Sequence, residues 1–215
     1  MKPGIHERRI PMKSLARHFA AATICGFGFL TPAAYAADTV MTEDAAIAVL
    51  QSSTDWAARY EACQSLRHNA TEKAVPALAG LLGDPTLAHA ARMALEPLPS
   101  SAADEALRDA LKSVEGELKA GIAITLGVRR DDKATADLAD LLKSDDRVVA
   151  DAAAGALGRI ASPKAIAALE KGKGGASADA AGEGLLAAGD VLRAEGEGKK
   201  AAKVYQGLLD GEWPA

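Results

Sequence analysis

Few residues in this sequence have the chemistry needed for catalysis or for binding a metal ion. Beyond residue 36 there are two histidines, His68 and His89, and one cysteine, Cys63. A zinc or iron site needs three or more converging nitrogen, sulfur or oxygen ligands, and two histidines 21 residues apart do not provide them. The sequence has no G-x-S-x-G motif for a serine hydrolase, whose general base would have to be one of the same histidines. We therefore expect no metal, no cofactor and no enzymatic activity.

Charged side chains are the remaining candidates for a functional surface. We expect a set of them on the outward faces of the second helices of the repeats described below, where they would contact a partner: Glu105, Arg108, Asp109, Lys112, Asp137, Asp140 and Lys143. The alternative is that these alternating charges form only a solvated surface. The run Arg129-Arg130-Asp131-Asp132 is predicted to be a turn whose charges compensate one another. Cys63 is interpreted as a small buried apolar residue.

The first 36 residues have the pattern of a secretory signal peptide. Basic residues precede the apolar stretch FAAATICGFGFLTPAA, and Ala34-Tyr35-Ala36 places small residues where a signal peptidase cleaves. We expect an exported protein, periplasmic or secreted; an uncleaved membrane anchor is the alternative. Removal of residues 1–36 would leave 20 basic and 28 acidic residues, a net charge of −8. This charge disfavours nucleic-acid binding because it repels phosphate groups.

Leucine recurs with a period of about thirty residues between residues 54 and 172. Two columns, each with intervals of 29, 31 and 31, consist of Leu66, Leu95, Leu126 and Leu157, and of Leu78, Leu107, Leu138 and Leu169. An alanine or isoleucine stands four residues before each leucine, which places the apolar residues on one helical face. The pattern predicts helix pairs at 54–67/72–83, 86–97/102–113, 117–129/133–143 and 147–160/163–171, after a lead-in helix at 43–51 within residues 37–53.

Helices of this length are marginal alone, so repeated pairs must stack to become stable. The predicted fold class is therefore all-α, an α-solenoid (a superhelix of antiparallel helix pairs). Glycines inside the first helices are expected where neighbouring helices meet closely: Gly121, Gly127, Gly155 and Gly158.

The stretch DDRVVADAAAGALGRIASPKAIAALEKG resembles a HEAT-like repeat of the phycobilisome-lyase type. Ala156-Leu157-Gly158 and Thr125-Leu126-Gly127 match the end of the first helix in that family, whereas the units at 54–83 and 86–113 depart from it. The resemblance covers about residues 54–172. It implies an armadillo-like solenoid whose second helices line the concave face, but lyase subunits, scaffolds and regulators all use such repeats.

The chain after a predicted linker at 173–179 has a different pattern. Residues 180–215 resemble a tetratricopeptide hairpin through the residues Leu185, Gly189, Leu192, Ala201 and Tyr205. One hairpin is expected to cap the solenoid with Trp213 across its end; the alternative is that repeats continue beyond Ala215. The predicted function is that of an exported, non-enzymatic scaffold that binds a protein partner and is a monomer outside its complex. The alternative is an accessory subunit or regulator of an enzyme, such as a lyase.

Overall fold

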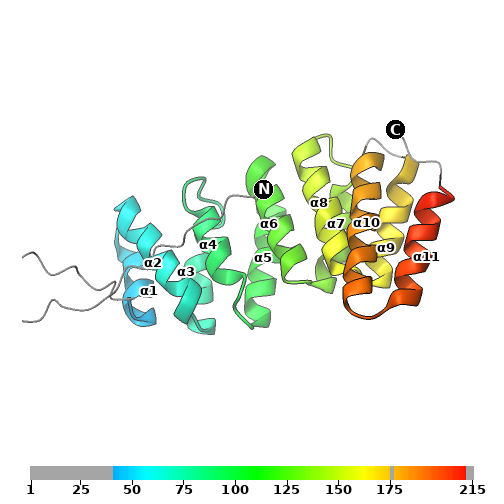
Figure 1. Ribbon diagram of the computed structural model, residues 1–215. Helices are drawn as coiled ribbons and strands as arrows, with labels where there is room; N and C mark the ends of the chain where they lie inside the picture. The colour runs from blue at the N-terminus through cyan, green and yellow to red at the C-terminus, as the bar shows by residue number, and fades with distance from the viewer. Residues whose placement is uncertain (1–40, 175–176, 212–215) are drawn as a thin grey trace, which may run out of the picture. The chain divides into compact units, whose positions relative to one another are not determined.

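The structure is a computed structural model of the 215-residue chain, and it describes residues 41–174 and 177–211. These residues belong to the unit Val40–Ala215. The predicted signal segment, 1–36, and Trp213 lie outside the described residues. Within the described ranges the fold is all-α and has no strand, as predicted (Figure 1).

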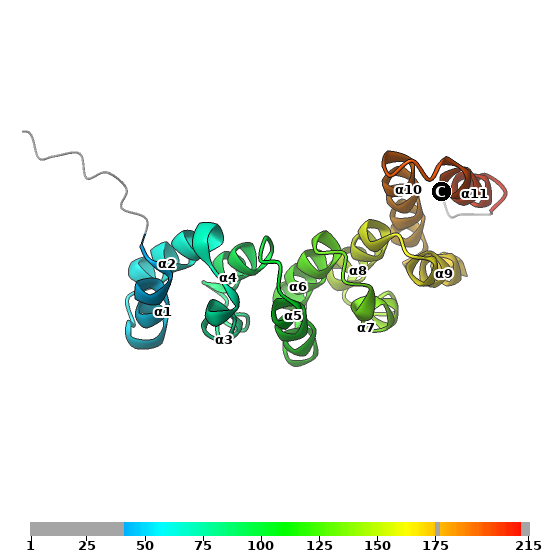
Figure 2. The same cartoon turned by 90° about the horizontal axis from the view of Figure 1, so that it is seen from below.

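The helices form two layers, one from the first and one from the second helix of each pair (Figure 2). The first-helix layer contains α2 (Trp56–Asn69), α4 (Ala88–Leu95), α6 (Gly116–Val128), α8 (Arg147–Ile160) and α10 (Ala178–Ala194). The second-helix layer contains α1 (Glu43–Ser52), α3 (Val75–Ala79), α5 (Ser101–Ser113), α7 (Thr135–Leu141) and α9 (Pro163–Lys171). The last helix, α11 (Gly198–Leu209), packs on α10.

Two of the second helices are shorter than predicted. Residues 72–74 and 132–134 form 3-10 turns, η1 (Glu72–Ala74) and η2 (Asp132–Ala134), so regular α-helix begins only at Val75 and Thr135. A third such turn, η3 (Gly172–Gly174), follows α9. Thr71 and Asp131 cap η1 and η2 by accepting a hydrogen bond from the backbone N–H two residues later.

The two leucine columns form the core, as their spacing predicts. Each of the eight leucines has 0 % of its surface exposed. The same holds for the residues four positions earlier, which are Ala62, Ala91, Ile122, Ala153, Ala74, Ala103, Ala134 and Ala165. Burial of one leucine contributes roughly 1.5–3 kcal/mol, so the two leucine columns supply much of the stability of the stacked helices.

Glycine and alanine bring α6, α8 and α10 into close contact. A Cβ atom at Gly127 would lie 2.5 Å from the Cα of Ala156, and one at Gly158 would lie 2.5 Å from the carbonyl oxygen of Gly184. Because neither space can hold a methyl group, glycine is required at both positions. The expectation was wrong for Gly155, where an added Cβ would have no atom within 4 Å.

The segment after residue 177 continues the stack as a fifth helix pair. Its α10 packs on α8 within the first-helix layer, and α11 packs on α10. The ring of Tyr205 lies against Gly189, where a Cβ atom would overlap it, and the Tyr205 hydroxyl donates to Asp190 at 2.9 Å. At the other end, α1 takes the position of a second helix: Ala46 and Leu50 are buried 28 residues before Ala74 and Leu78.

Candidate functional site

The charged residues expected to contact a partner lie mostly on the surface of the second-helix layer. Two ion pairs within helical turns, Asp109 with Lys112 at 3.8 Å and Asp140 with Lys143 at 3.1 Å, have side chains that are 63–81 % exposed. Glu105 is also exposed, and Asp137 is partly exposed. Exposed pairs of this kind add about 0–1 kcal/mol each, so these charges remain available to a partner at little cost to the fold.

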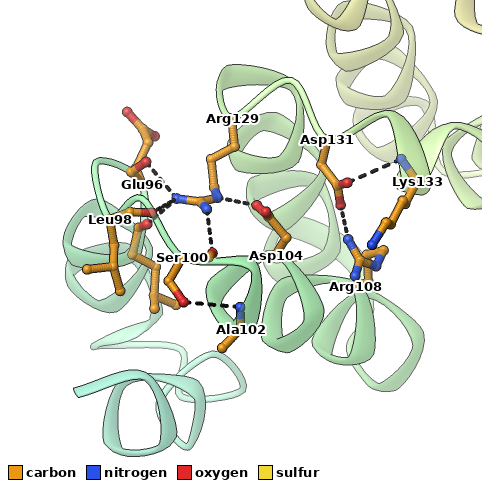
Figure 3. A network of polar contacts seen from close by, with 10 residues as sticks. Glu96, Leu98, Ser100, Ala102, Asp104, Arg108, Arg129, Asp131 and Lys133 are labelled. Carbon is orange, nitrogen blue, oxygen red and sulfur yellow. Dashed lines mark hydrogen bonds and ion pairs between the residues drawn. The ribbon is translucent and has the colours of Figure 1, made fainter. Parts of the chain in front are cut away.

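Arg108 does not lie on this outward surface, contrary to the expectation. Its guanidinium forms an ion pair with Asp131, and only 13 % and 7 % of the two side chains are exposed (Figure 3). Asp131 also accepts a hydrogen bond from the backbone N–H of Lys133 at 3.2 Å. Arg108 therefore connects α5 to Asp131, the residue that caps η2, and stabilises the contact between these two elements.

Among the described residues, the side chain of Arg129 makes the most hydrogen bonds, a role that its local sequence does not indicate. It follows α6 and reaches the turn between α4 and α5 (Figure 3). Its Nε donates to Asp104 at 2.5 Å, and 7 % of its side chain is exposed. Its two Nη atoms donate, at 2.7–3.0 Å, to the carbonyl oxygens of Leu95, Glu96, Leu98 and Ser100. A planar guanidinium with five N–H groups suits such a set of acceptors.

The charges of the run 129–132 are thus not compensated within the turn, and that prediction was wrong. Arg129 and Asp131 both pair with residues of α5, while Arg130 pairs with Glu195, which follows α10. The hydrogen bond from Arg130 lowers the pKa of Glu195. The turn carries these side chains toward different elements, so it connects successive repeats.

Another arginine with little exposed surface, Arg92, occupies the space between α4 and α6. Its Nη1 donates to the carbonyl oxygen of Gly121 at 2.9 Å and to the hydroxyl of the fully buried Thr125 at 3.1 Å. A Cβ atom at Gly121 would lie 2.6 Å from Nη2 of Arg92, so this glycine makes room for a guanidinium. Burial lowers the pKa of Arg92.

A groove of about 790 Å³ lies between α7 and α9. The apolar residues of its lining, which we call its floor, are four alanines and one leucine: Ala136, Ala139, Leu142, Ala167 and Ala168. Four lysines, Lys133, Lys143, Lys164 and Lys171, border it together with Asp132. Of these lysines, only Lys143 was among the predicted contact residues. The interval of 31 residues between Lys133 and Lys164 equals the repeat period, and this was the signal in the sequence that the two lysines occupy equivalent positions in neighbouring repeats.

The histidines and the cysteine do not form a site. His68 and His89 are exposed on α2 and α4, and Nδ1 of His89 lies 3.3 Å from Nη2 of Arg92. Among the described residues there is no group of three or more histidine, cysteine or acidic side chains that could hold a metal ion. Cys63 is fully buried, and burial raises its pKa to about 11.

No helix in the described ranges is long and apolar enough to cross a membrane.

The family model of HEAT repeats matches residues 104–180, which extend from α5 into the start of α10. This stretch contains Arg129, the partners Arg108 and Asp131, and the groove between α7 and α9. Together with the two helical layers, the match supports HEAT-like repeats in this part of the chain. No curated protein matches the chain. The lyase subtype and the tetratricopeptide resemblance of the last hairpin stay predictions.

Proposed function

We propose that this chain is an exported, non-enzymatic scaffold that binds another protein through its second-helix layer. The observation that carries the proposal is the contrast between two sets of charges. Arg92, Arg108 and Arg129 are largely buried and connect the repeats to one another. The charges along the outward surface of α5 and α7 are exposed and contribute little to stability. Stacked helical repeats present extended surfaces of this kind to their partners.

Export is supported by the sequence of residues 1–36 alone. A basic start, a short apolar stretch and Ala34-Tyr35-Ala36 are typical of a cleaved signal peptide. N-terminal sequencing of the chain isolated from the organism that makes it should therefore find Ala37 as the first residue. A chain that retains residues 1–36 within the membrane fraction would contradict export as a free protein.

The binding surface can be tested by capture from the native envelope fraction on the immobilised full chain. The double variant Glu105→Lys/Asp109→Lys changes two exposed residues of α5. The control, Glu61→Lys/Glu183→Lys, makes the same change in charge at exposed positions of the first-helix layer. We expect the α5 variant to lose the captured protein and the control to keep it, with both variants as stable as the wild type.

Two outcomes would count against the proposal. Equal loss by both variants would indicate a nonspecific effect of charge. Undiminished capture by the α5 variant would show that the second-helix layer is not the binding surface.

A further inference from the structure

The groove between α7 and α9 combines this apolar floor with a position between two neighbouring helices of one layer. Four of the five floor residues are alanines, and the fifth is Leu142, which is 7 % exposed. Small side chains on both helices leave a concave surface where larger ones would fill the space. Grooves bounded by helices accept an amphipathic helix, whose apolar face lies on the floor.

The lysines around this floor are unusual in an acidic chain. The chain has 29 acidic and 25 basic residues, yet four lysines and only one carboxylate line the groove. Within the described ranges, Lys133, Lys164 and Lys171 form no ion pair, and Lys143 pairs only with the exposed Asp140. Since Lys133, Lys164 and Lys171 do not neutralise charges of the fold, they are complementary to negative charges of a bound molecule.

The positions of the lysines indicate what kind of anion would fit. Lys133 and Lys164 lie near the beginnings of α7 and α9, whereas Lys143 and Lys171 lie near their ends. Lys164 and Lys171 are seven residues apart, which corresponds to roughly 10 Å along a helix. Cations separated in this way suit carboxylates spaced along a helix better than the single head group of a fatty acid. A nucleic-acid backbone fits poorly, because the floor is apolar and the chain is acidic.

We infer that this groove binds an acidic amphipathic helix of the partner protein. The apolar side chains of that helix lie on the alanine floor, and its glutamates or aspartates, about seven residues apart, pair with Lys133, Lys164 and Lys171. The inference rests on the proposed function, because it specifies the chemistry of the partner at one part of the second-helix layer.

The test uses a fluorescent synthetic helix of about 18 residues, long enough to pass both walls of the groove. Leucines at spacings of three and four form its apolar face, and glutamates seven residues apart flank that face. Binding to the purified full chain is followed by fluorescence anisotropy. We expect Lys164→Glu/Lys171→Glu to weaken binding by roughly tenfold or more. The matched control, Lys199→Glu/Lys203→Glu on the exposed surface of α11, should stay within about twofold of the wild type.

Three further probes make the result specific: the same peptide with glutamine for glutamate, a shuffled peptide of the same composition without an apolar face, and dodecanoate as a competitor. Weaker binding of both altered peptides supports the inference. Equal binding of either peptide, or of the Lys164→Glu/Lys171→Glu variant, overturns it. Binding of dodecanoate without binding of the helix also overturns it, in favour of a site for small amphiphilic anions.

Failure of this inference can be distinguished from failure of the proposed function. If the designed helix does not bind while Glu105→Lys/Asp109→Lys still abolishes capture of the native partner, the groove inference falls and the scaffold function stands. If the wild-type chain captures no protein, the scaffold function falls, and the inference about its partner falls with it.

Discussion

Replacement of Arg129 by alanine should be among the most destabilising substitutions outside the leucine columns. The change removes the hydrogen bonds that Arg129 donates to Asp104 and to the carbonyl oxygens of Leu95, Glu96, Leu98 and Ser100, at distances of 2.5–3.0 Å. Only 7 % of the Arg129 side chain and 26 % of the Asp104 side chain are exposed, so water replaces these bonds incompletely. Removal of one partner from a buried ion pair costs about 3–5 kcal/mol, and we expect a loss of that size.

The adjacent Arg130 provides a matched control. It also forms an ion pair, with Glu195, but 46 % and 39 % of the two side chains are exposed. An exposed pair contributes about 0–1 kcal/mol, so Arg130→Ala should cost about that amount. Its backbone has φ = 57°, which arginine and alanine tolerate equally, so the substitution changes no backbone strain. The two variants therefore compare a buried and an exposed arginine in one turn.

Urea unfolding, followed by far-UV circular dichroism, measures the free energy of unfolding of each variant. The slope of this free energy against urea concentration shows whether the cooperativity of unfolding has changed. A third variant, Arg129→Lys, keeps the charge but loses the planar fork of donors, and should recover only a minor part of the loss. Equal free energies of unfolding for Arg129→Ala and Arg130→Ala would refute the reasoning, because the contacts with the α4–α5 turn would then contribute nothing measurable. Full recovery by Arg129→Lys would show that charge alone is important.

Other substitutions and a pH titration test the packing of the stack. Leu126→Asp, which buries a charge in α6, should lower the free energy of unfolding by more than about 4 kcal/mol. Ile124→Asp, at a position 40 % exposed on the same helix, should lower it by about 1 kcal/mol in the same urea assay. In α8, Gly158→Ala should lower the melting temperature because its Cβ would lie 2.5 Å from a backbone oxygen of α10. Gly155→Ala, whose Cβ would have no atom within 4 Å, should raise the melting temperature and add about 0.5–1 kcal/mol to the free energy of unfolding. A shift of the melting temperature in the same direction for both variants would contradict this account. The raised pKa of Cys63, from 9.0 to about 11, means that only the unfolded chain ionises this thiol in that range. Stability should therefore fall between pH 9 and about pH 11 more steeply in the wild type than in Cys63→Ala, and parallel pH profiles would argue against burial as the cause.

The core of this fold could be predicted from the sequence because burial follows the repeat. A residue that recurs every 29–31 positions meets the same environment in each helix pair, and all members of both leucine columns are fully buried. The positions eight residues before the first-helix leucines follow the rule less strictly. Leu87 and Val149 are buried there, but Ala58 and Leu118 are only partly buried. Periodicity thus identifies the centre of each interface better than its margins.

The arginine contacts could not be predicted from local sequence. Neighbouring opposite charges at 129–132 suggest pairs within the turn, but the partners of Arg129 and Arg130 lie 25 and 65 residues away. The backbone of the turn, in which Arg130 is left-handed, determines the element that each side chain meets. The groove was missed for a different reason: its floor consists of alanines, and their spacing alone does not show whether two short helices enclose a space between them.

Neighbouring first helices meet in two ways, through glycines or through an arginine side chain, and this difference bears on the geometry of the proposed binding surface. Between α6, α8 and α10, glycines allow the backbones to meet directly, and little freedom remains. Between α4 and α6, the guanidinium of Arg92 lies against Gly121, so part of this contact is made by a side chain and not by direct packing of the two backbones. The ion pairs of Arg108 with Asp131 and of Arg129 with Asp104 each connect α5 to the turn that leads from α6 into α7. They therefore fix the exposed charges of α5 relative to the groove between α7 and α9, and a partner that contacts both regions would depend on arginines that it does not touch.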